Sequence, residues 1–381
     1  MNILQVIPKL GFGGAETGCF DLAHYLYEKN CRSFIATGGG DLIKYINKDK
    51  VKVFKFLVHS KNPLIILINV FILIFIIIFY KIDIVHARSR APAWSCLIAT
   101  KITRRKFVTT FHGTYNFKNK IKKFYNSIMV RSDLVIAGSN FIFSHVSTNY
   151  KNFFVNKKKK LMVIFRGINT NYFDERKVSK TKIELLYKKI KIEKDFFKIL
   201  LPGRITKWKG HKIFLQALNI LSQKEDTKPF VAIIIGSDQG RTVYKKELIS
   251  LVSQYRLNHA VKFIDKSESM PAIYSIADIV ISSSIEPEAF GRVSVEAQSM
   301  CKPIIASNLG GSKETILKEK SGYLYDSQSP NDLADIIYAC MNMSPESLKS
   351  FGIEGRKNIL KKFDVEKMCN TTFTEYNKLI G

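Results

Sequence analysis

The chain has 381 residues, 46% of them hydrophobic, and a formal net charge of +28 at neutral pH. This length fits two domains of ordinary size, and the hydrophobic content is sufficient for two cores. The six cysteines are scattered without a Cys-x-x-Cys pair, which predicts unpaired thiols in a reducing compartment and argues against a zinc site. The first residues are typical of a strand and not of a signal peptide.

The first half of the chain alternates apolar runs with stretches of helical character, a pattern typical of a parallel sheet with helices on both faces. Its expected strands are 3–7, 33–37, 51–58, 83–86, 106–111, 134–137 and 160–165. We expect the strands near 51–58 and 83–86 to be neighbours in this sheet.

Residues 64–80 form a strongly apolar segment in which Asn69 is the one clearly polar side chain. Its length touches the lower limit for a membrane-spanning helix, roughly 17 residues. A true span would place the flanking strands on opposite sides of a bilayer and so divide the sheet. The sequence therefore favours a buried or membrane-grazing helix over a span.

A polar, lysine-rich passage at 171–194 is expected to be an interdomain linker or a surface helix. A second set of strands follows at 198–201, 231–235, 261–264, 279–282, 303–306 and 322–325. The pattern predicts an α/β protein with two doubly wound domains, 1–175 and 176–364. Because ligands bind beyond the carboxyl ends of the strands in such sheets, we expect the site in the cleft between the domains.

The large positive charge includes lysine runs at 118–123 and 157–160. These runs fit an anionic membrane surface, but a solvated, lysine-rich surface explains them equally simply. Nucleic acid would match the charge, but the sequence contains no recognisable nucleic-acid-binding module.

The most informative stretch is 286–296, EPEAFGRVSVE, which follows an apolar run typical of a buried strand. Glu288 is expected in the loop leaving that strand, and Glu296 one or two turns into the next helix. Between them, Phe290 and Gly291 offer backbone N–H groups at a helix N-terminus, which is a ready anion site. A diphosphate on these amides, with one carboxylate near ribose hydroxyls and the other near sugar hydroxyls, would suit a nucleotide-sugar.

This Glu-x7-Glu motif, followed by KPIIA at 302–306 and GGSKE at 310–314, resembles the retaining GT-B glycosyltransferases of family 4, also called glycosyl transferases group 1. The run PEAFGRVSVEAQSM resembles, more narrowly, the bacterial lipopolysaccharide-core mannosyl- and glucosyltransferases. The resemblance covers nearly the whole chain. It implies a GT-B fold, with two Rossmann-like domains facing across a cleft and a C-terminal helix, 365–381, packing back on the first domain.

The resemblance assigns Arg204 and Lys209 to a clamp on the donor diphosphate, where two cations would stabilise the charge that builds as the diphosphate departs. The alternative is two ordinary surface cations. Gly236, Phe263 and Ile264 would line the nucleotide pocket by the same resemblance, although all three also fit a plain core.

In the first half, Gly13 and Gly14 resemble the family's first loop, where glycines let the backbone approach a ligand closely; a tight strand-to-helix turn is the alternative. His112 would touch the donor sugar near the reacting carbon, or be structural. Arg88 would hold anionic groups of the acceptor. Ser139 either binds phosphate or caps a helix.

Three positions depart from the family pattern. Asp265 stands where glycine is frequent, and its side chain tolerates left-handed backbone better than most. Cys301 also replaces a frequent glycine, so strain is expected there. Asn169 replaces aspartate in an interdomain turn that asparagine also makes.

Taken together, we expect a cytoplasmic hexosyltransferase, peripheral on the inner membrane, with GDP-mannose or a UDP-hexose as donor. Its acceptor would be a lipid-linked saccharide, most simply the lipopolysaccharide core. With no Asp-x-Asp pair, neither a metal nor another cofactor is expected. The alternatives are a GT-B nucleotide-sugar epimerase and a non-catalytic basic membrane-binding protein.

Overall fold

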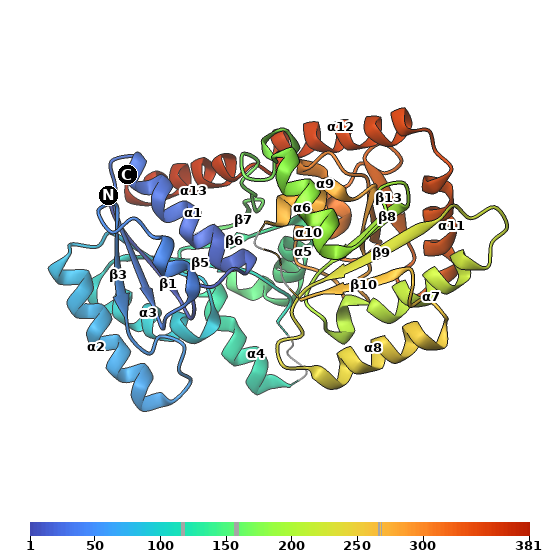
Figure 1. Cartoon of the computed structure of the whole chain (residues 1–381). Helices are drawn as coiled ribbons and strands as arrows, with labels where there is room; N and C mark the ends of the chain where they lie inside the picture. Colours follow the sequence, from blue (N-terminus) through green and yellow to red (C-terminus); the bar gives the residue numbers. More distant parts are fainter. Residues whose placement is uncertain (116–118, 156–159, 266, 268) are drawn as a thin grey trace. The chain divides into compact units, whose positions relative to one another are not determined.

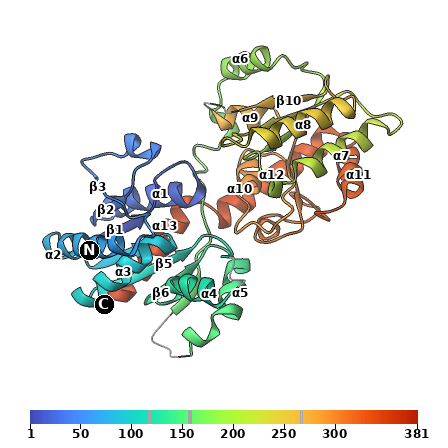
Figure 2. The ribbon, with the colours of Figure 1, turned by 90° about the horizontal axis from the view of Figure 1, so that it is seen from below.

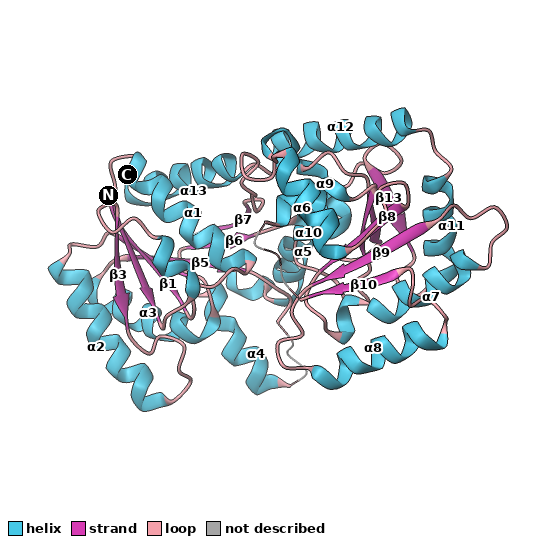
Figure 3. Ribbon diagram, in the orientation of Figure 1, coloured by secondary structure: helices cyan, strands magenta, loops and turns pink. Residues whose placement is uncertain are grey.

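The computed structural model describes residues 1–115, 119–155, 160–265, 267 and 269–381. The chain forms two compact units, each built on one parallel sheet (Figures 1 and 3). Unit 1 is Met1–Gly167 with Val365–Gly381, and unit 2 is Ile168–Asp364. Residues 168–175, which we had expected in the first domain, thus belong to unit 2, whereas the last helix belongs to unit 1.

Unit 1 contains a seven-stranded sheet in the order β3-β2-β1-β4-β5-β6-β7. Its strands are β1 (Asn2–Ile7), β2 (Arg32–Thr37), β3 (Val51–Lys55), β4 (Ile84–Ala87), β5 (Lys106–Phe111), β6 (Leu134–Ala137) and β7 (Lys160–Val163). The inner strands β1, β4, β5 and β6 are almost entirely buried, as strands covered on both faces require, whereas the edge strands β3 and β7 are partly exposed. The expectation that 51–58 and 83–86 are neighbours was wrong, because β2 and β1 lie between β3 and β4.

The α-helices of unit 1 are α1 (Gly14–Glu28), α2 (Pro63–Phe79), α3 (Arg90–Thr103), α4 (Lys120–Asn126), α5 (Asn140–Asn149) and α13 (Val365–Ile380). Helices α1 and α13 lie on one face of the sheet, and α2 and α3 on the other (Figure 1). His86 ties α13 to the sheet, because its ring nitrogens hydrogen-bond Tyr376 at 2.5 Å and Thr110 at 2.7 Å. Burial holds the pKa of His86 well below its ordinary value, so this ring is a neutral structural element.

Unit 2 contains a six-stranded parallel sheet in the order β10-β9-β8-β11-β12-β13. Its strands are β8 (Phe197–Pro202), β9 (Phe230–Ile235), β10 (Val261–Ile264), β11 (Ile279–Ser282), β12 (Ile304–Ser307) and β13 (Gly322–Tyr325). Its α-helices are α6 (Lys180–Ile190), α7 (His211–Ser222), α8 (Thr242–Gln254), α9 (Met270–Ile276), α10 (Arg292–Ser299), α11 (Pro330–Met341) and α12 (Pro345–Lys362). The alternation of strands and helices expected from the sequence, and with it the two-domain α/β fold, is confirmed.

Two departures from the family pattern have clear structural outcomes. The side chain of Asn169 accepts from the backbone N–H groups of Asn171 and Tyr172, so the expected turn is present. Cys301 follows α10 with φ at 53°, in the left-handed region that glycine adopts at lower cost. The expected strain at Cys301 is therefore located in its backbone.

Candidate active site

The candidate site of unit 2 is at the carboxyl edge of its sheet, where β8 and β11 lie side by side although they are far apart in sequence. Strand β8 leads through β9 to β10 on one side, and β11 leads through β12 to β13 on the other. This is the topological switch point at which open α/β sheets bind ligands. Arg204 and Lys209 follow β8, and Glu288 follows β11.

Glu288 and Lys209 are brought together by this arrangement. The Lys209 Nζ donates to Oε1 of Glu288 at 2.7 Å, and both side chains are nearly buried. Ser284 donates to the same oxygen at 2.5 Å. The second oxygen, Oε2, has no hydrogen-bond partner among the residues that the structure describes. A carboxylate accepts through both oxygens, so Oε2 is available to a hydroxyl group of a ligand.

Glu296 lies one turn into α10 and is also nearly buried. Its Oε1 accepts from Arg292 at 2.6 Å, and its Oε2 accepts from Tyr274 at 2.8 Å. Each oxygen retains one lone pair for a ligand hydroxyl. The sequence did not indicate Tyr274, because it lies 22 residues from Glu296 with no motif around it. The contact of Arg292 with Glu296 could have been predicted, because residues four apart on a helix are neighbours.

The ring of Trp208 contacts two of the cations that follow β8. The guanidinium of Arg204 lies 5.9 Å from the centre of its ring, and the Lys209 Nζ lies 4.6 Å from it. Such cation–π contacts orient cations without neutralising them. Arg204 is exposed and Lys209 is not. The expected clamp residues therefore lie on one loop and share one aromatic side chain.

Gly291 is the residue that precedes α10, and its φ of 86° is left-handed. A Cβ there would lie 2.6 Å from the backbone of Ser312, so the position requires glycine. The Phe290 side chain is buried against Phe363, so it is the backbone of 290–291 that faces the N-terminus of α10. Anion binding by these backbone amides stays a prediction.

The remaining predicted residues of unit 2 lie near the same edge. Gly236 follows β9, and a Cβ there would lie 1.8 Å from the carbonyl oxygen of Gly203, so the two loops pack backbone to backbone. The Gly236 N–H donates to the Ile264 carbonyl at 2.9 Å. Phe263 is partly buried and packs on the core of unit 2, as the alternative interpretation of this residue expected.

Unit 1 has its own switch point between β1 and β4. Gly13 and Gly14 follow β1 and begin α1. His112 follows β5, and its Nδ1 accepts from Arg166 at 2.8 Å. A Cβ at Gly14 would lie 3.4 Å from the same guanidinium, so two of these positions, Gly14 and His112, lie against Arg166. The sequence did not indicate Arg166 as a site residue, although Asn169, three residues later, marked a turn.

Burial and, secondarily, the nearby Arg166 charge hold the pKa of His112 well below its ordinary value. A guanidinium can only donate, so the neutral ring accepts at Nδ1 and carries its proton on Nε2. That Nε2 is buried and has no hydrogen-bond partner among the described residues. His112 is therefore poised as a neutral hydrogen-bond donor.

Arg88 and Ser139, both predicted ligand contacts, are buried and hydrogen-bonded within unit 1. Arg88 is buried and donates to Gln5 at 2.6 Å, while its Nε lacks a partner among the described residues. Ser139 caps α5 by accepting from the Ile142 N–H at 3.2 Å. Helix capping was one of its two predicted roles; phosphate binding stays a prediction.

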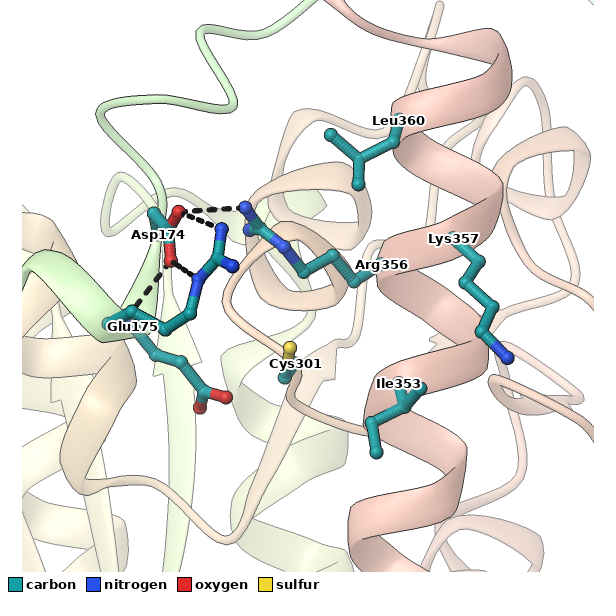
Figure 4. A pocket seen from close by; sticks show the side chains of 8 residues that line it. Asp174, Glu175, Cys301, Ile353, Arg356, Lys357 and Leu360 are labelled. Atoms are coloured by element: carbon teal, nitrogen blue, oxygen red, sulfur yellow. Dashed lines mark hydrogen bonds and ion pairs between the residues drawn. The ribbon is translucent and has the colours of Figure 1, made fainter.

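A separate hollow of about 230 Å³ in unit 2 is shown in Figure 4. Its lining includes Asp174, which is bound by the guanidinium groups of Arg176 and Arg356 at 2.7 and 3.0 Å. The Arg176 hydrogen bonds lower the pKa of Asp174 to about 2. This charge cluster anchors α12 to the start of unit 2, and we assign it a structural role.

The membrane and metal expectations concern partners that are identified by other features than the contacts of the site. In the described part of the chain, no helix combines the length and apolar character needed to cross a membrane. The described residues also hold no group of three or more His, Cys, Asp or Glu arranged to bind a metal. Of the lysine runs, Lys118 and residues 157–159 lie outside the described residues.

Comparison with known proteins defines the family. The sequence model described as Glycosyltransferase Family 4 matches residues 12–172, and that described as Glycosyl transferases group 1 matches residues 182–358. The structure resembles a glycosyltransferase from Rickettsia africae, with 36% identity, a TM-score of 0.91, and coverage of 100% of this chain and 98% of that one. The chain therefore belongs to the GT-B glycosyltransferases of family 4.

Two more distant proteins are also similar. Alr3699/HepE of Anabaena, solved with UDP and glucose, has a TM-score of 0.82 at 22% identity over 99% of this chain and 100% of that one. Spore coat protein SA of Bacillus subtilis is 25% identical over 316 residues, which cover 78% of this chain and 79% of that protein.

Proposed function

We propose that the protein transfers a hexose from a nucleoside-diphosphate sugar to a lipid-linked saccharide, with retention at the anomeric carbon. The observation that carries the donor site is the Lys209–Glu288 pair, which joins the ends of β8 and β11 beside Arg204 and the N-terminus of α10. The UDP and glucose bound to HepE support a nucleotide-sugar donor for the same fold.

In this proposal, Glu288 holds hydroxyls of the donor sugar and Glu296 holds the ribose. Arg204, Lys209 and the α10 amides stabilise the leaving diphosphate without a metal, because they supply positive charge where negative charge grows. The acceptor hydroxyl oxygen bonds to the anomeric carbon while the bond to the diphosphate breaks on the same face. The acceptor proton passes to a phosphate oxygen of the departing nucleoside diphosphate.

Unit 1 would bind the acceptor, with His112 donating from Nε2 near the reacting sugar. Mannose as the sugar and the lipopolysaccharide core as the acceptor rest on the resemblance of the PEAFGRVSVEAQSM run. A lipid-linked acceptor would hold the enzyme peripherally at the cytoplasmic face of the inner membrane.

The test is incubation of the purified protein with GDP-mannose, UDP-glucose and UDP-galactose, measuring nucleoside-diphosphate release with and without membrane lipid extract. We expect slow release with one donor and faster release when the extract contains the acceptor. NMR of the product would show retained anomeric configuration. Recovery of an epimerised nucleotide-sugar, or binding of none of the donors, would contradict the proposal.

A further inference from the structure

Helix α2 presents an apolar face to solvent over its whole length. The side chains of Leu64, Ile68, Phe71, Phe75, Ile78 and Phe79 are each more than half exposed. Positions 64, 68, 71 and 75 follow one another at three or four residues, and 78 and 79 lie three and four residues beyond 75, which places all six on one side of the helix. We call these six residues the α2 face. Figures 1 and 2 show α2 on the outer side of unit 1, next to α3.

The polarity of α2 is the reverse of that of an ordinary surface helix. Its one clearly polar side chain, Asn69, is buried and donates to the Leu57 carbonyl at 3.0 Å. Its opposite side is buried through Val70, Leu73 and Ile77. The helix is thus apolar both toward the core and toward solvent. Large exposed apolar patches mark a surface that binds another apolar phase.

The charges of the sequence on either side of α2 identify that phase. Residues 50–132 contain sixteen Lys or Arg residues and a single acidic residue, Asp83. Exposed lysines flank both ends of the helix at Lys61 and Lys81, and Arg104 and Arg105 follow α3. A second copy of this chain would bring like charges together, which opposes self-association through this surface. An anionic surface over an apolar interior matches both features.

We propose that the α2 face lies in the interface of a membrane whose surface carries anionic lipid headgroups. The apolar side chains enter the acyl boundary, and the flanking lysines remain at headgroup level. The helix has 17 residues and rises about 25 Å at 1.5 Å per residue, which is short of a hydrocarbon core of about 30 Å. Buried contacts on its other side also keep it in the fold, so it lies along the membrane.

This surface is independent of the donor site, which lies in unit 2, although it would place unit 1 beside the proposed lipid-linked acceptor. The full-length protein is mixed with vesicles of phosphatidylcholine alone or with phosphatidylglycerol, and binding is measured by sedimentation. We expect binding only to the anionic vesicles. The double variant Phe71→Ser/Phe75→Ser should bind at least about tenfold more weakly, because it removes apolar area without changing charge.

The matched control is Leu185→Ser/Ile249→Ser, which removes two exposed apolar side chains of unit 2 and should bind as the wild type does. Insertion itself is measured with Phe75→Trp and vesicles containing brominated lipid, using Leu185→Trp as control. Fluorescence should be quenched in Phe75→Trp and unchanged at position 185. Donor hydrolysis should be unaffected in every variant, so loss of membrane binding is distinguishable from failure of the proposed transferase activity.

Two results would overturn the inference. One is vesicle binding that survives Phe71→Ser/Phe75→Ser, or that leaves Phe75→Trp unquenched, which would mean that lysines alone hold the protein. The other is a lipid-free dimer in analytical ultracentrifugation that Phe71→Ser/Phe75→Ser dissociates. That dimer would make a second copy of the chain the occupant of the α2 face.

Discussion

At the carboxyl edges of the two sheets, the charged side chains have different kinds of partner. In unit 2, Lys209 lies against Glu288, and Arg292 lies against Glu296, so each carboxylate is oriented by a cation. In unit 1, Arg88 donates to Gln5 and Arg166 to His112, which are neutral side chains. In these contacts, the carboxylates of unit 2 are bound by cations, and the two arginines of unit 1 donate to neutral side chains. The comparison predicts that unit 2 is sensitive to loss of charge, and unit 1 to loss of a neutral hydrogen bond.

The largest effect is expected for Glu288→Ala. This change removes the oxygen that we propose to bind the sugar and leaves Lys209 without its carboxylate, so we expect turnover to fall about a thousandfold, similar to the loss of a key preorganised electrostatic contact. The fold should survive, because the Gly311 N–H donates to the backbone carbonyl of residue 288, which alanine retains. Steady-state kinetics measures the turnover, and circular dichroism checks that the fold is retained. Glu286→Ala, at an exposed position two residues earlier, is the control and should retain activity.

Next in size are Arg204→Ala and Lys209→Ala, each expected to lower kcat about a hundredfold because the diphosphate charge grows in the transition state. Lys207→Ala, an exposed lysine of the same loop, is the matched control and should change little. Chelation with EDTA should leave wild-type activity in place. Loss of activity on chelation that a divalent ion restores would mean that a metal, and not these cations, stabilises the leaving group.

In unit 1, His112→Ala should lower kcat about tenfold or more, because it removes the neutral donor that we propose to lie near the reacting sugar. The lowered pKa of His112 predicts a flat kcat/KM profile between about pH 6 and 8. An ionisation near pH 6.5 that disappears in His112→Ala would show that the imidazole is charged in part of this range, contrary to the structure.

The pH dependence of protein stability gives an independent check on the lowered pKa values of the His86 and His112 rings. The folded pKa values of His86 and His112 lie below the unfolded value, so the unfolded chain binds more protons as the pH falls below about 6.5. Unfolding free energy should therefore decrease on acidification through that value. In His112→Ala the decrease should be smaller, because only His86 of this pair remains.

The sequence predicted the strands well because parallel strands covered on both faces appear as continuous apolar runs, such as 230–235 and 279–282. It also placed Glu288 correctly in the loop that leaves a strand. It did not predict the partners of the site residues. Lys209 and Glu288 are 79 residues apart, and His112 and Arg166 are 54 apart; such contacts depend on strand order, which local patterns do not encode. The wrong pairing of β3 with β4 has the same cause.

The apolar segment 64–80 shows a related limit. Composition alone predicted a helix but not which side faces solvent, because nearly every position is apolar and the periodicity carries little information. Asn69 was the one marker of a face. Its burial by a hydrogen bond to Leu57 is a tertiary contact that the sequence does not reveal.

A smaller, more specific effect is expected for Glu296→Ala. Ribose contacts are equal in the ground and transition states, so their loss weakens donor binding without slowing chemistry. We expect the donor Kd to rise about tenfold, with kcat changed less than about threefold, as measured by calorimetry and steady-state kinetics. A large fall in kcat at saturating donor would place Glu296 at the reacting centre and remove its distinction from Glu288.

The smallest effect is expected for Cys301→Gly, at the opposite end of α10 from the proposed diphosphate site. Relief of the left-handed backbone is worth about 1 kcal/mol, partly offset by the greater flexibility of glycine in the unfolded chain. We expect unfolding free energy to rise by about 0.5 kcal/mol in denaturant titrations, with donor affinity unchanged. Cys301→Ser keeps the Cβ and the strain, so it should show no gain. An equal gain in Cys301→Ser would assign the cost to the thiol, and a change in donor affinity would show that the two ends of α10 are coupled.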